Sequence, residues 1–354
     1  MGHDGRGWTG ATNARPAREV ELRYGHGLVE QESSKWPRYL AVTTPTAWET
    51  AKGFLGQEPA GVGTVRYLDW DHLDEVTSAL PGDAGLVVGV GGGTALDASK
   101  YVALKKDLPL ILVPSAVSTG AIIHGMLAKW DGHKIIGSVK EWPYCDCEHV
   151  LVDYELVLNS PWYLNTAGLG DVLCMYSGVS EWRYNAANGA APPVDEPLVR
   201  PSLEYYDYLA DNFPATLGPD GSLTAESVRF IMTAVHERDD RQLRHPHAPG
   251  GGHGLANLSL EVIERTLIHG EVAALGSAII CWHTGEHDWL LDRLERCRVR
   301  VNPSVIGFEK DELRLLLERV PDLYREKGVR SVLVDEPIVG NRFEELWSFL
   351  TSVQ

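Results

Sequence analysis

Short apolar runs alternate with helical patterns through the first half of the chain. Each run is rich in Val, Ile or Leu and is bounded by Gly, Pro or polar residues, as in strands buried on both faces of a parallel sheet. The segments between them carry the spacing of helices, and the alternation predicts a doubly wound, Rossmann-like α/β domain with a mostly parallel sheet. The expected strands cover residues 38–45, 63–70, 85–93, 108–116 and 149–155.

The pattern changes near residue 160, where strand signals almost vanish and longer helical stretches begin. These stretches cover residues 165–189, 223–244, 257–283 and 309–328. The sequence therefore predicts two domains after a flexible leader. We expect the leader at 1–17, the α/β domain at 18–160 and an all-α domain at 161–354.

A glycine cluster follows one of the predicted strands in GLVVGVGGGTALDASKYVALKK, residues 85–106. A parallel strand that leads through Gly91, Gly92 and Gly93 into a helix start offers free backbone N–H groups and the positive end of a helix dipole, which suit a phosphate. The spacing matches neither GxGxxG nor the Walker pattern. A plain tight turn is therefore the alternative to phosphate binding.

The next predicted strand ends in LILVPSAVSTGAIIHG, residues 110–125. Pro114 is followed by three hydroxyl side chains, Ser115, Ser118 and Thr119, at the carboxyl edge of the same predicted sheet. Ligands of open α/β sheets bind at that edge. The competing interpretation is a strand-to-helix turn in which Ser and Thr serve as caps.

Three separate segments of the second half carry potential metal ligands. They are Asp171 in AGLGDVL, His253 in APGGGHGLAN and His269 in LIHGEVAALG. Two imidazoles and one carboxylate with open positions are typical of a catalytic rather than a structural metal site. Spacing alone cannot establish the set, because His245 and His247 lie in the same loop as His253 and any of these histidines could be a surface residue.

Composition narrows the classes of partner. The chain has 32 basic and 49 acidic residues, a formal net charge of -17, which argues against nucleic acid or an anionic membrane as a general partner. No apolar run approaches the length of a membrane span, and the polar start has no hydrophobic signal core, so we expect a cytoplasmic protein. The five scattered cysteines indicate neither a disulfide framework nor a thiolate zinc site.

The motifs together resemble a superfamily that joins glycerol dehydrogenases, iron-containing alcohol dehydrogenases, sn-glycerol-1-phosphate dehydrogenases and dehydroquinate synthases. The resemblance covers about residues 20–300. It is strongest to the glycerol-1-phosphate dehydrogenase branch, through GVGGGTALDASKY, LILVPSAVST, HVLVDYELV, AGLGDVL and HGEVAALG. HGLAN is similar to the glycerol dehydrogenase segment that supplies a metal-binding histidine.

The resemblance implies a site for each of two cofactors. A divalent metal, zinc before iron or nickel, would be held by Asp171, His253 and His269. NAD or NADP would lie against the glycine cluster and the loop after the next strand, and the implied homo-oligomer would be a dimer or larger. The residues implied for the dinucleotide are Thr43, Thr44, Gly91, Gly92, Gly93, Asp97, Lys100, Pro114, Ser115, Ser118 and Thr119.

Two departures from the superfamily pattern limit the transfer. The position of a substrate-contacting Asp is occupied by Gly120, so His124 or a residue of the helical domain would have to replace it. Thr43 and Thr44 stand where relatives often carry a ribose-binding Asp, which leaves NAD and NADP both possible. His124, His245 and His247 are candidates for proton transfer or substrate contact, with surface positions as the alternative.

The favoured function is a metal-dependent, NAD(P)-dependent dehydrogenase for a small polyol-type alcohol, either free or phosphorylated. Its active site would lie in a cleft between the two domains. One alternative is a sugar-phosphate cyclase similar to dehydroquinate synthase, although the metal ligand is Asp171 rather than the Glu typical of those enzymes. Another is a cofactor-binding homologue with altered or lost chemistry, which Gly120 would permit.

Overall fold

The computed structural model describes residues 20–137, 142–240 and 250–353, together with Leu243, His245, His247 and Ala248. The expected leader, residues 1–17, lies outside the described residues. The described chain forms two compact units. The α/β unit contains the residues up to Asn165 and the segment Gly218–Met232, and the helical unit contains Thr166–Leu217 and the residues from Thr233 onward.

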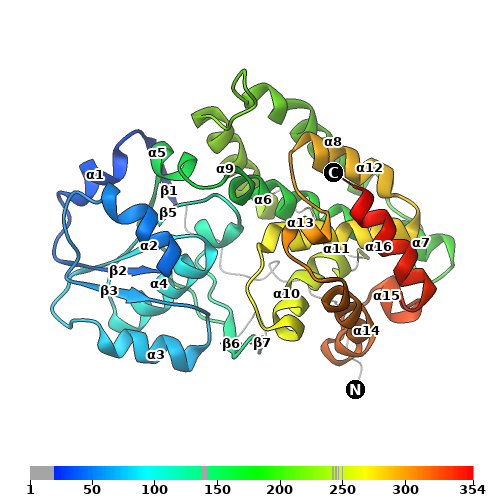
Figure 1. The fold of residues 1–354 in the computed structure, drawn as a ribbon, viewed down its shortest axis with the longest axis horizontal. Coiled ribbons are helices and arrows are strands. Elements are labelled where there is room, and N and C mark those ends of the chain that lie inside the picture. Colours follow the sequence, from blue (N-terminus) through cyan, green and yellow to red (C-terminus); the bar gives the residue numbers. More distant parts are fainter. Residues whose placement is uncertain are drawn as a thin grey trace. The chain divides into compact units, whose positions relative to one another are not determined.

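A parallel sheet of six strands forms the centre of the α/β unit (Figure 1). Its order is β1-β8-β5-β4-β2-β3, and every neighbouring pair is parallel. The sequence-based prediction of a Rossmann-like α/β domain is therefore confirmed. The strands are β1 (Glu21–Gly25), β2 (Tyr39–Thr43), β3 (Gly61–Thr64), β4 (Leu86–Gly91), β5 (Leu110–Pro114) and β8 (His149–Asp153).

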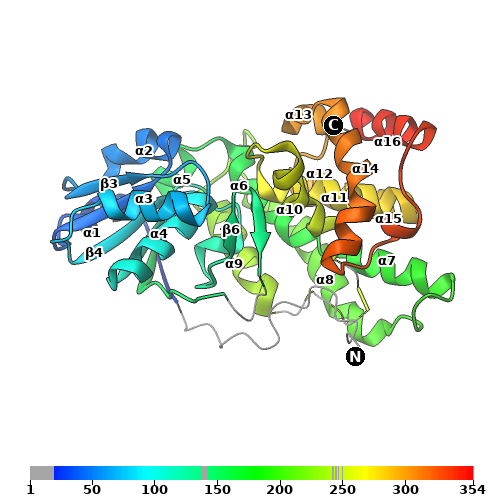
Figure 2. The ribbon, with the colours of Figure 1, turned by 90° about the horizontal axis from the view of Figure 1, so that it is seen from below.

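Helices cover both faces of this sheet. As a result, every residue of β2, β4 and β5 is buried. Figure 2 shows α2 and α4 on opposite sides of the strands. The α4 helix lies so close that a Cβ atom on Gly89 would come 2.1 Å from Ser99 Oγ. The helices of this unit are α1 (Leu28–Ser33), α2 (Pro45–Ala51), α3 (Trp70–Ala79), α4 (Gly93–Lys106) and α5 (Tyr154–Leu158), with 3-10 turns η1 (Lys52–Phe54) and η2 (Gly120–Ile122).

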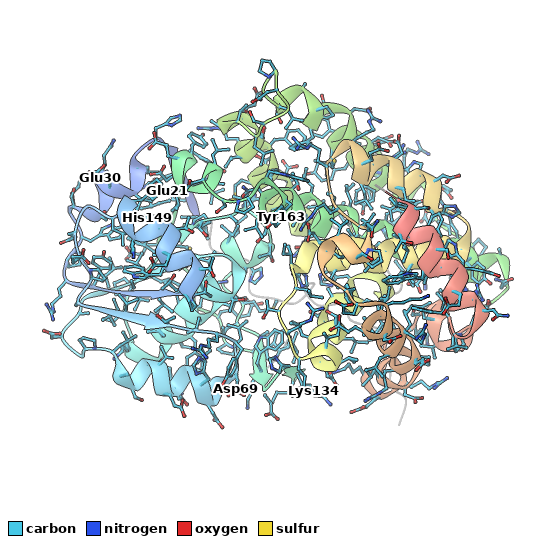
Figure 3. The ribbon with its side chains drawn as sticks, viewed as in Figure 1. Glu21, Glu30, Asp69, Lys134, His149 and Tyr163 are labelled. Atoms are coloured by element: carbon cyan, nitrogen blue, oxygen red, sulfur yellow. The ribbon has the colours of Figure 1, made fainter. Side chains whose placement is uncertain are left out.

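The strand predictions fail where the strands are least buried. The edge strand β1, with the polar sequence ELRYG, gave no apolar signal; it pairs with β8, and Glu21 and His149 are register partners (Figure 3). The other edge strand, β3, ends at Thr64 instead of continuing to residue 70, because Asp69 caps α3 by accepting a hydrogen bond from His72 N.

A short hairpin lies outside the main sheet and was also not predicted. It consists of β6 (Lys129–Asp131) and β7 (Lys134–Ile136). Its tip is tied to α3, since Gly132 N donates to Asp69 Oδ2 at 2.6 Å. Asp69 and Lys134 mark the two sides of this contact in Figure 3.

The segment Gly218–Met232 groups with the α/β unit, although the predicted boundary at 160 places it in the helical domain. Arg229 explains the grouping. Its Nε atom donates to Tyr154 Oη at 2.6 Å, and its guanidinium lies 4.5 Å from the ring centre of Tyr24. The division between the units falls inside α6 (Trp162–Leu173), between Asn165 and Thr166, and again inside α9 (Ala225–Asp240), between Met232 and Thr233.

The helical unit is built around α11, which is buried along almost its whole length. Such a helix is apolar on all sides because other helices surround it. The predicted helical stretch 165–189 is broken between Leu173 and Tyr176, so that it forms two helices. None of the described helices combines the length and apolar character needed to cross a lipid bilayer.

The helices from α6 onward are α6 (Trp162–Leu173), α7 (Tyr176–Ala187), α8 (Glu196–Asn212), α9 (Ala225–Asp240), α10 (Gly251–Ile263), α11 (His269–Thr284), α12 (His287–Arg296), α13 (Pro303–Ile306), α14 (Lys310–Lys327), α15 (Val332–Asp335) and α16 (Asn341–Ser352), with the 3-10 turn η4 (Phe213–Thr216). The apolar core of the unit is formed mainly by α10, α11, α14 and α16.

Candidate metal and dinucleotide sites

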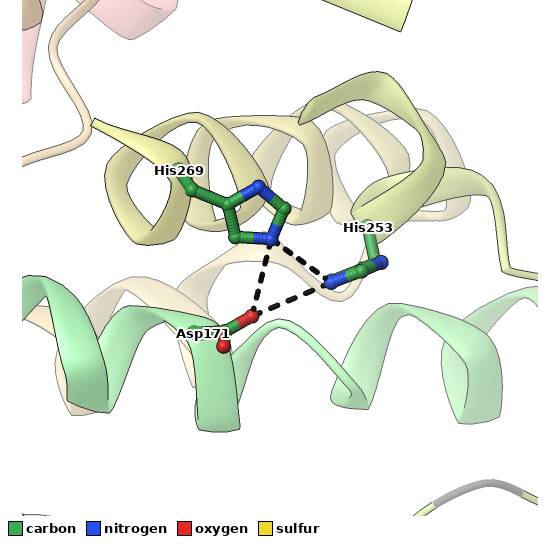
Figure 4. Close-up of side chains that lie close together, drawn as sticks. All are labelled: Asp171, His253 and His269. Carbon is green, nitrogen blue, oxygen red and sulfur yellow. Dashed lines mark hydrogen bonds and ion pairs between the residues drawn. The ribbon is translucent and has the colours of Figure 1, made fainter. Parts of the chain in front are cut away.

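Three helices of the helical unit bring one carboxylate and two imidazoles together (Figure 4). Asp171 comes from α6, His253 from the first turn of α10 and His269 from the first residue of α11. The two Nε2 atoms are 3.1 Å apart, and Asp171 Oδ1 lies 3.4 Å from that of His253 and 3.5 Å from that of His269. Residues separated widely in sequence thus present three donor atoms to one point.

Glycines allow the backbones of these helices to approach closely. A Cβ atom on Gly270 would lie 1.9 Å from Ala167 O, and one on Gly170 would lie 2.6 Å from Gly270 O. At the other crossing, a Cβ atom on Gly276 would lie 2.2 Å from Gly252 O. Because Gly170, Gly252 and Gly270 directly adjoin the three polar residues, the same close crossings that pack the helices also set the positions of the polar side chains.

The three donor atoms have the separations that a tetrahedral cation requires. Bond lengths of about 2.0–2.2 Å to His nitrogen and Asp oxygen place neighbouring ligand atoms about 3.3–3.5 Å apart. In addition, Asp171 Oδ1 is buried without a hydrogen-bond partner. A buried carboxylate oxygen that lacks a partner is costly, and a cation at this point would satisfy it. The donor set therefore fits a divalent metal.

The negative charge of Asp171 is balanced by Arg238, a residue that no sequence motif indicated. Burial would raise the pKa of Asp171, but the nearby guanidinium of Arg238 and the two imidazoles outweigh burial and hold that pKa well below its usual range. Arg238 donates from Nη1 to Asp171 Oδ2, the carboxylate oxygen that faces away from the imidazoles. Arg238 lies in the charged run HERDD, where nothing distinguishes it from a solvated surface residue.

A second buried acid supports the helix that carries His253. The carboxylate of Glu181 accepts hydrogen bonds from Ser331 Oγ at 2.6 Å and from Val332 N at 2.8 Å. It also lies against Gly251, where a Cβ atom would come 3.0 Å from Oε2. Burial raises the pKa of Glu181 to about 7. No sequence pattern distinguishes this residue either, because it is one of many acids on helices.

We expect Glu181→Gln to change the pH dependence of stability. The pKa of Glu181 is raised from an ordinary 4.5 to about 7 in the folded protein, so the unfolded chain releases this proton first as pH rises. Stability therefore falls between those values and is level above them. Relative to the variant, the native protein should lose roughly 2–3 kcal/mol of unfolding free energy between pH 5 and pH 8.

Urea unfolding at a series of pH values measures this difference. The matched control is Glu318→Gln, because Glu318 is exposed on α14. The control should follow the native pH curve. A Glu181→Gln curve parallel to the native one over this range would show that the acid does not titrate there.

The glycine cluster lies at the switch point of the sheet. The chain leaves β2 toward β3 and leaves β4 toward β5, which are opposite directions across the sheet. Open α/β sheets bind ligands at the carboxyl ends of such strands. Thr43 and Gly91 are the last residues of β2 and β4, so the predicted dinucleotide segments meet at this point.

Each glycine of the cluster has a different environment. Gly91 has φ +145°, which disfavours any residue with a side chain, and a Cβ atom there would meet Ala95 at 2.7 Å. Gly93 lies against Thr119, whose methyl group would be 2.8 Å from its Cβ atom. Gly92 is the N-cap of α4, makes no side-chain cap, and has open space where its Cβ atom would be. Its surroundings could accept an anion.

The loop after β5 is fixed beside this cluster. Ser115 N donates to Gly91 O at 3.0 Å, and Asn165 Oδ1 accepts from Val117 N at 2.9 Å. Ser115 is buried, whereas Ser118 and Thr119 are partly exposed. Asn165 is a further residue that sequence analysis missed. Pro114 ends β5, and the buried Gly120 begins η2, so no side chain extends from the position where the resemblance leads us to expect Asp.

The remaining predicted dinucleotide residues differ in their access to a ligand. Lys100 is 1% exposed, and its ammonium donates to Asp97 Oδ1 at 2.7 Å and to Ala121 O at 2.6 Å. It therefore joins α4 to the loop that contains Gly120. Thr43 is buried with its hydroxyl on the carbonyl of Thr44, and Thr44 is partly exposed.

The three further histidines lie in different environments. His124 is half-buried at the end of η2, and its backbone N donates to Gly120 O at 3.2 Å. His245 is buried, with Nε2 3.1 Å from Ser202 Oγ, and burial lowers its pKa. His247 is exposed beside the ring of Trp182. The group of potential ligands contains Asp171, His253 and His269 and none of these three.

Comparison with known proteins relates the chain to one group of enzymes. Residues 50–161 match the family described as iron-containing alcohol dehydrogenase. A glycerol-1-phosphate dehydrogenase (NAD(P)+) of Natronomonas pharaonis is 31% identical over 173 residues, 45% of this chain and 48% of that protein. This match thus spans about half the length of the relative.

A longer match is found with a protein of the same name from Halobacterium salinarum. It is 29% identical over 317 residues, which cover 82% of this chain and 85% of that protein. Among solved structures, a probable glycerol dehydrogenase from Sinorhizobium meliloti 1021 is 18% identical with a TM-score of 0.65. That comparison covers 94% of this chain and 98% of the other, and at this identity it establishes the fold.

Proposed function

We propose that this chain is a metal-dependent, NAD(P)-dependent dehydrogenase, because residues 50–161 match the iron-containing alcohol dehydrogenase family and most of the chain is similar to a glycerol-1-phosphate dehydrogenase. Its substrate is a small polyol-type alcohol, free or phosphorylated, or the corresponding ketone. The observation that carries the proposal is the triad of Asp171, His253 and His269, whose donor atoms lie within 4.8 Å of one another.

In this proposal the triad holds one divalent cation, for which zinc suits the mixed nitrogen and oxygen ligands and iron or nickel are alternatives. When bound, the cation supplies a Lewis acid for the substrate oxygen, and the nicotinamide exchanges the hydride. The chain's own part is to fix the ligands. Asp171 is held ionised, and the close helix crossings at Gly170 and Gly270 keep its oxygen and the His269 imidazole in register.

The proposed dinucleotide site is the glycine cluster at the end of β4. The free N–H groups and dipole of α4 favour the pyrophosphate, and the space beside Gly92 admits it. Lys100 does not face the open space beside Gly92 in this proposal. Its ammonium supports the site by donating a hydrogen bond to Ala121 O, in the loop after β5. Thr43 and Thr44 place no carboxylate at the end of β2, so a 2′-phosphate would meet no acidic side chain at these positions, and both NAD and NADP are retained.

The substrate contacts differ from those of the glycerol dehydrogenase pattern. Gly120 supplies no carboxylate, which favours either a different contact for the substrate hydroxyls or a homologue with altered chemistry. We retain His124 as a candidate for substrate contact or proton transfer, since it closes the same turn. Oxidation of NAD(P)H by small ketones would support the dehydrogenase, and phosphate release without net cofactor turnover would support the cyclase alternative.

Gly92→Asp tests the dinucleotide site by acting on folding and binding in opposite directions. An Asp at this N-cap should leave the melting temperature unchanged or raise it, because the residue can cap α4 and complement its dipole. The same carboxylate should repel the pyrophosphate and weaken NAD(P)H binding about 100-fold or more. NADH and NADPH fluorescence titration and a thermal melt measure the two effects.

Gly82→Asp is the control, because Gly82 also has open space at its Cβ position but lies away from α4 in the sequence. This variant should bind the dinucleotide like the native protein. If Gly92→Asp keeps native affinity while it remains folded, the dinucleotide does not bind at the glycine cluster. Metal content should be the same in all three proteins.

A further inference from the structure

We propose that Arg238 is a positioning residue of the metal centre, which takes Oδ2 of Asp171 and thereby leaves Oδ1 for the cation. Arg238 and the cation then neutralise the same buried carboxylate from its two oxygens. The inference rests on the proposed metal assignment. It assigns a role to a residue that the motifs and the resemblance leave without one.

The contact is buried on both sides. The side chain of Asp171 is 1% exposed and that of Arg238 is 10% exposed. Arg238 lies near the end of α9, 67 residues from Asp171, so the pairing results from the fold and not from helix spacing. A guanidinium has a fixed planar set of donors, which orients a carboxylate better than a flexible ammonium does.

The two oxygens of Asp171 have different surroundings. Oδ2 accepts from Arg238, whereas Oδ1 lies 3.4 Å and 3.5 Å from the Nε2 atoms of His253 and His269. An arginine guanidinium keeps its charge at any ordinary pH, so in the metal-free protein Arg238 is a permanent cation in contact with this carboxylate. The arginine also favours coordination through one oxygen, because the other is already engaged.

A second acid near the triad, Glu271, is paired with a different arginine, Arg300. Glu271, two residues after His269, is 1% exposed and is held by Arg300 at 2.5 Å and 2.9 Å. The contact between Asp171 and Arg238 is therefore distinct from that between Glu271 and Arg300. Removal of one partner from such a pair leaves an uncompensated buried charge, which is strongly destabilising.

This sharing predicts that the arginine and the metal can partly replace each other in stabilising the fold. With either cation present, the Asp171 carboxylate is compensated; with neither present, it is not. The stabilising effects of Arg238 and of the metal should therefore be coupled rather than additive. A purely structural arginine would make the same contribution with and without metal.

Thermal melts of chelator-treated protein, with and without added Zn²⁺, test this inference. Arg238→Met should lower the melting temperature of the metal-free protein by about 5–15 °C. Zn²⁺ should recover most of this loss, so that the shift caused by Zn²⁺ is larger in the variant than in the native protein. Arg238→Lys, which retains the charge, should resemble the native protein more closely. Asp171→Asn combined with Arg238→Met should melt above Arg238→Met alone when metal is absent.

Three outcomes would overturn the inference itself, and a fourth would overturn the metal assignment on which it rests. An equal loss of stability with and without Zn²⁺ would assign Arg238 a structural role only, and no loss in Arg238→Met would deny the charge compensation. If Arg238→Met does not fold, the double variant Arg238→Met with Asp171→Asn provides the test. A double variant that is also unfolded would contradict the inference. Absence of bound metal and of any Zn²⁺ shift in the native protein would overturn the metal assignment itself, and is recognised by metal analysis.

Discussion

Replacing His269 by alanine is expected to abolish stoichiometric metal binding and to lower turnover at least about a thousandfold, because a Lewis acid stabilises the transition state by several kcal/mol. His269 supplies one of three donor atoms that lie within 4.8 Å of one another. With one imidazole removed, two ligands remain, which is too few for the site. Metal analysis of the purified protein and an NAD(P)H assay with small ketones measure both losses.

The proposed dinucleotide site provides the internal control for His269→Ala, because its residues belong to a different unit. NAD(P)H affinity should stay within about twofold of the native value, since no binding contact is altered. His287→Ala is the control for loss of a histidine in the helical unit, because His287 is not one of the three potential ligands. The ring of His287 lies 4.8 Å from that of Phe349, centre to centre. Full metal content and turnover in His269→Ala would contradict the assignment.

Replacing Gly270 by alanine is expected to cost about 3 kcal/mol of unfolding free energy, because the added methyl group overpacks a backbone contact. The new Cβ atom would lie 1.9 Å from Ala167 O, and neither backbone can yield as a flexible side chain would. The helices α6 and α11 must separate at this crossing, which moves Asp171 and His269 apart. Metal affinity should therefore fall together with stability.

Gly250→Ala is the matched variant for Gly270→Ala. Gly250 caps α10 in the same unit with φ -93°, and no atom lies within 4 Å of its Cβ position. Its stability should change by no more than about 0.5 kcal/mol. Denaturant unfolding and metal titration of the two variants test the comparison. A Gly270→Ala protein with native stability and native metal affinity would show that the helix crossing does not set the ligand positions.

Whether a strand could be predicted from the sequence depends on how far that strand is buried in the fold. The segments 85–93 and 108–116 were recognised because β4 and β5 are buried on both faces and so consist of continuous apolar residues. The edge strand β1 presents exposed and half-buried residues, among them Glu21, and has no such signal. The hairpin strands β6 and β7 have only three residues each, and none of these residues is fully buried.

The candidate site was accessible to sequence analysis only through the resemblance. His253 and His269 are separated by 16 residues and Asp171 precedes His253 by 82, so helix periodicity cannot relate them. These side chains come together because the helix backbones cross closely. Glycines permit such crossings, but a glycine in the sequence does not show where a crossing occurs. Arg238 and Glu181 act at the site through tertiary contacts alone, and an arginine or glutamate on a helix is ordinarily a surface residue.

Anomalous diffraction at the metal absorption edge, from crystals of the protein loaded with one equivalent of Zn²⁺, tests the metal assignment most directly. The account predicts one strong peak about 2.0–2.2 Å from Asp171 Oδ1 and from the Nε2 atoms of His253 and His269. Zn²⁺ bound elsewhere, with no peak among these three atoms, would contradict it.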